Sequence, residues 1–88
     1  MTKAELQAFA QAQVDLLKPK AADTQKASGQ RAKGKLMFYE ALLAVYGNTQ
    51  TPEQFGLLDA VNDTFQEIGA FASGVTFFSE PEECCRTP

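Results

Sequence analysis

Histidine and tryptophan are absent from this 88-residue chain, and cysteine occurs only as the neighbouring pair Cys84 and Cys85. Without histidine the chain lacks the commonest general base and the commonest metal ligand. A structural zinc site needs four ligands, and two thiols among carboxylates make a poor set. The sequence therefore predicts no catalytic residue, no metal site and no cofactor.

The cysteine pair also argues against a disulfide framework. Neighbouring Cα atoms lie ~3.8 Å apart, whereas a disulfide usually joins Cα atoms separated by ~4.4–6.8 Å. Glu80, Glu82 and Glu83 precede the pair closely, whereas an activated thiolate needs an electropositive setting. We therefore expect ordinary thiols in a reducing compartment, the cytoplasm.

Long hydrophobic runs and phosphate-binding glycine motifs are missing as well. The longest uncharged stretch near the end, 68–79, has 12 residues, while a membrane-spanning helix needs ~20. Glu5 and Asp15 interrupt the start of the chain, so no signal peptide is expected there. Gly29 and Gly34 fit neither a P-loop nor a dinucleotide-binding turn. These absences predict neither a membrane span nor a nucleotide site.

What the chain does have is an ordinary globular composition with an uneven distribution of charge. Hydrophobic residues make up 44% and charged residues 22%, which is typical of one folded domain. Residues 1–36 carry seven basic and three acidic side chains, whereas residues 37–88 carry one basic and eight acidic ones. We expect a single helical domain over 1–78 and an acidic, cysteine-containing tail over 79–88.

A first helix is predicted from Thr2 and Glu5, which match a capping box. Apolar residues then recur at spacings of three and four, as on one face of a helix. This apolar face comprises Leu6, Phe9, Ala10, Val14 and Leu17. Pro19 is expected to end the helix, because the residue before a proline is disfavoured in the α region.

Residues 20–35 are ambiguous, since alanines favour a helix there while Ser28, Gly29 and Gly34 weaken it. The segment is either helical from an N-cap at Asp23 or Thr24, or a solvated loop.

The next helix, 36–46, has two apolar stripes on different sides. The stripes are Leu36, Tyr39, Leu43 and Tyr46, and Phe38, Leu42 and Val45. Such a helix must be covered twice, by other parts of the chain or by a second subunit. Gly47 and Asn48 predict its left-handed end.

The third helix has the clearest start, because Thr51, Pro52 and Gln54 supply an N-cap, a first-turn proline and a capping-box partner. Its predicted inward face consists of Leu58, Val61, Phe65, Ile68 and Ala72, widened by Leu57 and Phe71. Gly69 or Gly74 is expected to end it. Val75 to Phe78 then predict an extended segment, and Ser79 with Glu82 matches another capping box. The expected fold is all-α, a bundle of three helices with a fourth as the alternative, and a short extended C-terminal tail.

Two charged segments are candidate binding surfaces. The basic segment supplies six of the eight basic residues within 18 positions, namely Lys18, Lys20, Lys26, Arg31, Lys33 and Lys35. Such side chains can follow a phosphate backbone, although no aromatic residue within the segment offers a base a stacking surface. The segment predicts either nucleic-acid binding or a solvated surface.

The acidic ladder consists of Asp59, Asp63 and Glu67, which stand four residues apart on one helix face, with Asn62 and Gln66 beside them. Like charges at this spacing cost a helix a few tenths of a kcal/mol per pair. The ladder predicts a surface for a basic partner, and the alternative is a solvated outer face. A third interpretation pairs the basic segment with the ladder, within one chain or between two chains.

The C-terminal aromatic cluster comprises Phe71, Val75, Phe77 and Phe78. These residues either close the end of the bundle or form an exposed patch at an oligomer interface. Together with the doubly apolar helix 36–46, the cluster predicts a homodimer.

The leading functional hypothesis is a non-catalytic protein-interaction module, a small adaptor or inhibitor of a larger protein. Short acidic helical proteins without catalytic motifs are common among phage and mobile-element accessory proteins. This hypothesis rests on that general analogy and on no shared motif. The alternative is a nucleic-acid-binding protein that uses residues 18–35, and nothing marks a small-molecule pocket.

Overall fold

The computed structural model describes residues 1–85, and within this range it contains three α-helices, one short 3-10 turn and no strand. The helices are α1 (Lys3–Ala21), α2 (Ala27–Tyr46) and α3 (Pro52–Glu67), and the turn is η1 (Pro81–Glu83). The predicted all-α class with three helices is confirmed. The fourth helix of the alternative amounts to the three residues of η1.

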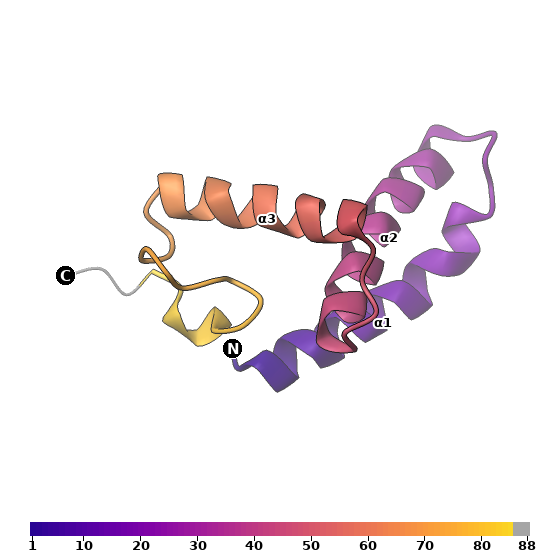
Figure 1. Cartoon of the computed structure of the whole chain (residues 1–88). Helices are drawn as coiled ribbons and strands as arrows, with labels where there is room; N and C mark the ends of the chain where they lie inside the picture. Colours follow the sequence, from indigo (N-terminus) through magenta and orange to yellow (C-terminus); the bar gives the residue numbers. More distant parts are fainter. Residues whose placement is uncertain (86–88) are drawn as a thin grey trace.

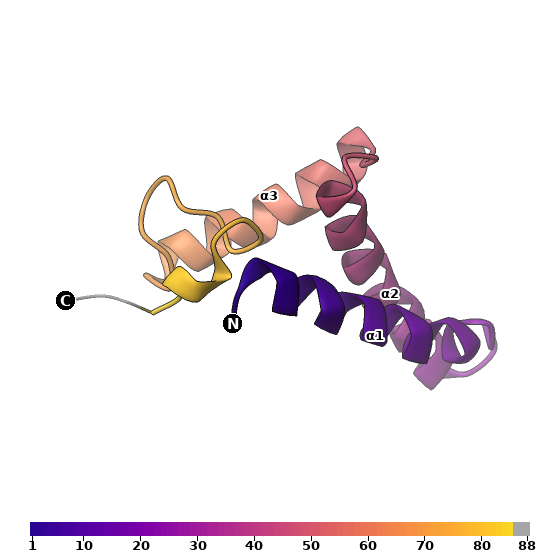
Figure 2. The same cartoon turned by 90° about the horizontal axis from the view of Figure 1, so that it is seen from below.

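The three helices form an elongated molecule of 46 × 24 × 23 Å. α1 and α2 pack side by side as an antiparallel hairpin, and α3 leaves the end of α2 at a steep angle (Figure 1). Residues 68–85 then fold back beneath α3 towards the N-terminal end of α1, where η1 makes contact (Figure 2). In the part of the chain that is described, no helix has both the length and the apolar character that crossing a bilayer requires.

Two capping boxes begin α1 and α3, as predicted. The Glu5 N–H donates to Thr2 Oγ1 at 3.2 Å, and the Thr2 N–H donates to Glu5 Oε1 at 2.9 Å. The latter bond is the main reason that the pKa of the Glu5 carboxyl is lowered. At α3 the corresponding bonds join Thr51 and Gln54 at 3.1 and 2.9 Å. Both starts are local, since each capping box joins two residues that are three positions apart.

The connection between α1 and α2 differs from the prediction in two ways. α1 continues through Pro19 to Ala21, since one missing N–H in the last turn removes only one backbone bond while Leu17 stays buried. α2 begins at Ala27 with Lys26 as its N-cap, and neither Asp23 nor Thr24 caps it. The intervening loop packs tightly on the first turn of α2, where a Cβ added to Gly29 would lie 1.7 Å from a main-chain oxygen.

The two apolar stripes of α2 are covered by two different parts of the same chain. On one side Tyr39 meets Phe9 of α1 edge-on, with ring centroids 5.9 Å apart. On the other side Phe38 stacks on Phe77 of the C-terminal segment at 6.1 Å. The central core consists of Ala10, Ala41, Leu42, Leu58, Phe71 and Phe77. The chain thus covers the two stripes without a second subunit.

α2 and α3 end in left-handed turns, close to the positions predicted. After α2 the left-handed residue is Asn48, with φ 58°, whereas Gly47 has φ −88°. After α3 it is Gly69, with φ 80°. The predicted inward face of α3 was therefore too long: the helix ends at Glu67, so Ile68 and Ala72 lie beyond it, and Ile68 is 71% exposed.

The C-terminal segment consists of turns and is not the extended stretch that was predicted. The Tyr46 hydroxyl donates to the Phe78 carbonyl at 2.6 Å, and the Cys85 N–H donates to the Ala70 carbonyl at 2.7 Å. The predicted Ser79 capping box is absent from this segment, because η1 begins at Pro81 after Glu80 and has no side-chain cap. The first bond holds the segment against α2, and the second closes the segment on itself. Phe71 and Phe77 of this segment lie in the core.

Candidate protein-interaction surface

The acidic ladder lies on the outer face of α3. Asp59, Asp63 and Glu67 are all exposed, and each is one helical turn from the next. Over residues 1–85 the single ion pair joins Lys26 and Asp23, with Nζ and Oδ2 3.9 Å apart. No basic residue occurs between positions 36 and 85. Within the described chain, the ladder therefore has no cation bound to it.

The ladder is also placed unfavourably with respect to its own helix. The C-terminal end of a helix carries a partial negative charge, which cations stabilise and anions destabilise. Glu67 is the last residue of α3, and no basic residue lies in the last turn. Repulsion between the carboxylates adds to this cost. The acidic face therefore lowers the stability of the helix that carries it.

Asn62 and Gln66, predicted to belong to the same surface, have a structural role instead. Asn62 is 5% exposed, and its Oδ1 accepts the Phe77 N–H at 3.0 Å. Gln66 is half-buried, and its Nε2 donates to the Val75 carbonyl at 3.0 Å. Both side chains tie the C-terminal segment to α3. The sequence suggested otherwise because amides beside acidic residues are typical of exposed helix faces.

The basic segment surrounds the closed end of the α1–α2 hairpin, away from α3 (Figure 1). Its six side chains are all exposed. On α2, however, Lys33 lies on a different side from Arg31 and Lys35, because residues two apart on a helix point in nearly opposite directions. The described residues contain no ion pair between this segment and the ladder. The structure therefore does not show the predicted pairing of the basic segment with the ladder within one chain. Nucleic-acid binding by the segment stays a prediction.

The aromatic cluster closes the end of the bundle. Phe71 and Phe77 are each 7% exposed, while Val75 and Phe78 are half-buried against the same core. The alternative, an exposed patch for an oligomer interface, does not agree with this burial. The homodimer stays a prediction, although both features that suggested it are now explained by packing within one chain.

The cysteines are free and exposed, with their sulfur atoms 2.6 Å apart. The hydrogen bond with Cys85 raises the pKa of the Cys84 thiol, which lowers the fraction of reactive thiolate at neutral pH. Among the residues described, no three histidine, cysteine or carboxylate side chains are grouped so that they could hold a metal ion.

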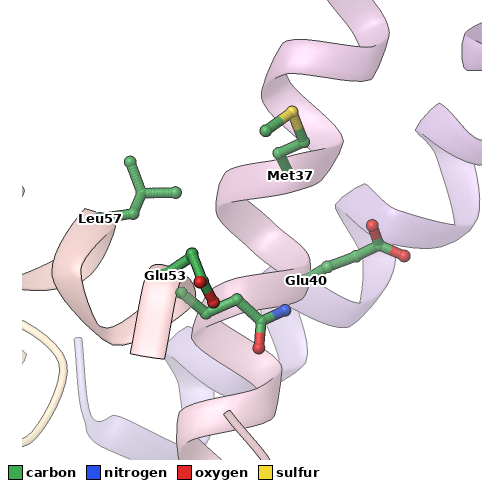
Figure 3. A pocket seen from close by; sticks show the side chains of 5 residues that line it. Met37, Glu40, Glu53 and Leu57 are labelled. Atoms are coloured by element: carbon green, nitrogen blue, oxygen red, sulfur yellow. The ribbon is translucent and has the colours of Figure 1, made fainter. Parts of the chain in front are cut away.

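A groove between α2 and the start of α3 was not predicted. It encloses about 300 Å³ and is lined by Met37, Glu40, Glu53, Gln54 and Leu57. Met37 projects from α2 and Leu57 from α3 towards the same gap (Figure 3). The sequence held one indication of this groove, because Met37 is a large apolar residue that belongs to neither apolar stripe of α2. Its partner Leu57 had been assigned to the inward face of α3, yet it is 38% exposed.

This chain matches no protein-family model, no curated protein and no solved structure.

Proposed function

We propose that this protein is a non-catalytic interaction module that binds a larger, basic protein through the acidic ladder. The observation that carries the proposal is the outer face of α3, where three exposed carboxylates follow one another without a cation at ion-pair distance in the described chain. A basic surface on a partner would supply the missing counter-charges.

The cost of the ladder to α3 supports this proposal. Each like-charged pair destabilises a helix by a few tenths of a kcal/mol, and the position of Glu67 at the C-terminal end adds to that. Sites of function are often kept at some expense of stability. Complementary charge on a partner would speed encounter and set orientation more than it would raise affinity. A small adaptor or inhibitor of the phage or mobile-element accessory type, acting in the cytoplasm, would use such a surface.

The test compares three forms of the chain as bait in lysate of the native host. In the first variant, Asp59→Asn, Asp63→Asn and Glu67→Gln remove the charges and keep the side-chain sizes. We expect this variant to be at least as stable as the parent chain, because it loses only repulsion. We also expect it to lose the proteins that the parent retains, as identified by mass spectrometry.

The matched control removes three carboxylates elsewhere, by Glu80→Gln, Glu82→Gln and Glu83→Gln. These residues lie before and within η1. Their substitution changes the net charge by the same amount as the ladder variant does. Retention of a specific protein by the control, and its loss from the ladder variant, is the expected result. Equal retention of every captured protein by both variants would refute the proposal. Unfolding cannot explain a loss if urea melts show that the ladder variant is as stable as its parent.

A further inference from the structure

The groove between α2 and α3 combines exposed apolar side chains with an acidic rim. Met37 is 58% exposed and Leu57 is 38% exposed, although the other large apolar residues of α2 are at least half-buried. Neither residue belongs to the buried core. The groove volume of about 300 Å³ is at the lower end of the range for binding sites, ~300–1,000 Å³. A space of this size suits one large apolar side chain.

The charges at the groove are of one sign. Glu53 stands at the start of α3 beside the gap, and Glu40 projects from α2 with its carboxylate directed away from Leu57 (Figure 3). Both carboxylates are exposed, and neither has an ion-pair partner in residues 1–85. A partner whose side chain enters the groove would therefore bind best if it carried a cation on each side of that side chain.

The groove is continuous with an exposed flank of α3 that runs beside the acidic ladder. Glu53, Leu57, Ala60 and Thr64 follow at spacings of three and four and are all exposed. A helix laid along this flank would place its apolar side chains on Leu57 and Ala60 and its cations opposite the ladder. Recognition of an amphipathic helix by anchor residues at this spacing is a common mode of protein binding.

We propose that the groove receives a large apolar side chain from a basic amphipathic helix of the partner protein, with lysine or arginine one turn away on each side. This proposal rests on the proposed function, because it names the element of the basic partner that docks. Met37 is suited to such contact, since its unbranched thioether adapts to irregular apolar surfaces.

A synthetic 18-residue helical peptide of leucine and lysine, with leucines along one face, serves as the probe. The full chain is titrated with it, and binding is followed by calorimetry and by the NMR shifts of backbone amides. We expect the largest shifts near positions 37, 40 and 53–57. The double variant Met37→Ser with Leu57→Ser is expected to bind at least about tenfold more weakly. A peptide with glutamate in place of lysine is expected not to bind.

The matched control is Leu16→Ser. Leu16 lies on α1, is 54% exposed and does not line the groove. It should leave the affinity for the peptide unchanged. Equal weakening by the control and by the double variant would overturn the groove proposal, as would shifts confined to the basic segment. If the double variant still captures the cellular partner that the ladder variant loses, the proposed function stands and the groove proposal falls.

A second copy of this chain is the competing occupant, since Leu16 is 54% exposed and Lys18 and Lys20 follow it. Light scattering of the parent chain distinguishes the two. Because the apolar features that predicted a homodimer are packed within one chain, the groove proposal instead expects a monomer at high concentration. A salt-sensitive dimer that Leu57→Ser dissociates would overturn the assignment to a separate partner.

Discussion

Asn62 offers the sharpest test of how the C-terminal segment is held. Its carboxamide oxygen accepts the N–H of Phe77, a residue 15 positions away, and the bond is buried. In Asn62→Ala the acceptor is lost, and the N–H of Phe77 is left without a partner inside the molecule. Because Phe77 stacks on Phe38 of α2, the loss also loosens a contact of the core.

The expected cost follows from that environment. Leaving a buried backbone donor unsatisfied costs about 1–3 kcal/mol. For a chain of 88 residues the total free energy of unfolding is roughly 4–13 kcal/mol, at ~0.05–0.15 kcal/mol per residue. A loss of about 2 kcal/mol would lower the Tm by roughly 8–16 °C in a domain of this size. Urea and thermal unfolding followed by circular dichroism measure both quantities.

Two further variants calibrate this result. Asp63→Ala changes the exposed neighbour on the same helix and should alter the free energy of unfolding by less than about 0.5 kcal/mol. Gln66→Ala removes a half-buried bond to the Val75 carbonyl, so a loss of about 0.5–1.5 kcal/mol is expected. If Asn62→Ala were no more destabilising than Asp63→Ala, the structural role of Asn62 would be refuted. Below its Tm the Asn62 variant should also still retain the partner.

Gly34→Ala should raise the free energy of unfolding by about 0.5–1 kcal/mol, because its added Cβ meets nothing within 4 Å. Gly29→Ala should lower it, because the added Cβ would lie 1.7 Å from a main-chain oxygen, and urea melts that shift equally for both would contradict this packing. Burial raises the pKa of Tyr46 to about 12 from 10.0, so its contribution to stability is complete below pH 10 and is lost as the pH rises towards 12. An absorbance titration should show a late tyrosinate transition that Tyr46→Phe removes, and its persistence in that variant would exclude Tyr46 as the source. The hydrogen bond with Cys85 raises the pKa of Cys84, so Cys85→Ala should speed alkylation of Cys84 by iodoacetamide at neutral pH, as measured by mass spectrometry. An unchanged or slower rate would argue against that hydrogen bond.

Features that depend on a few neighbouring residues could be predicted from the sequence alone. The capping boxes at Thr2 and Thr51 and the left-handed turn at Gly69 are local, because each closes hydrogen bonds within one or two helical turns. The double apolar character of α2 was likewise visible in its periodicity. The ladder itself follows from a spacing of four, which any helix over that range would place on one face.

Which polar residues of α3 are buried was decided by the tertiary structure. Asn62 and Gln66 look like members of the acidic face until the C-terminal segment returns to meet them. The start of α2 is another case, since its N-cap is Lys26 and not Asp23 or Thr24, and the loop closes tightly on Gly29. Both depend on contacts that helical periodicity does not describe.

The candidate surface likewise has features that the sequence determines and features that only the fold determines. The sequence alone determined that residues 1–36 are mainly basic and residues 37–88 mainly acidic. Only the tertiary structure placed the basic segment at the closed end of the α1–α2 hairpin, away from α3, and brought Met37 beside Leu57 to form a groove. The physical reason is that charge and periodicity are properties of a segment, whereas a groove and the distance between two charged surfaces depend on how separate helices pack.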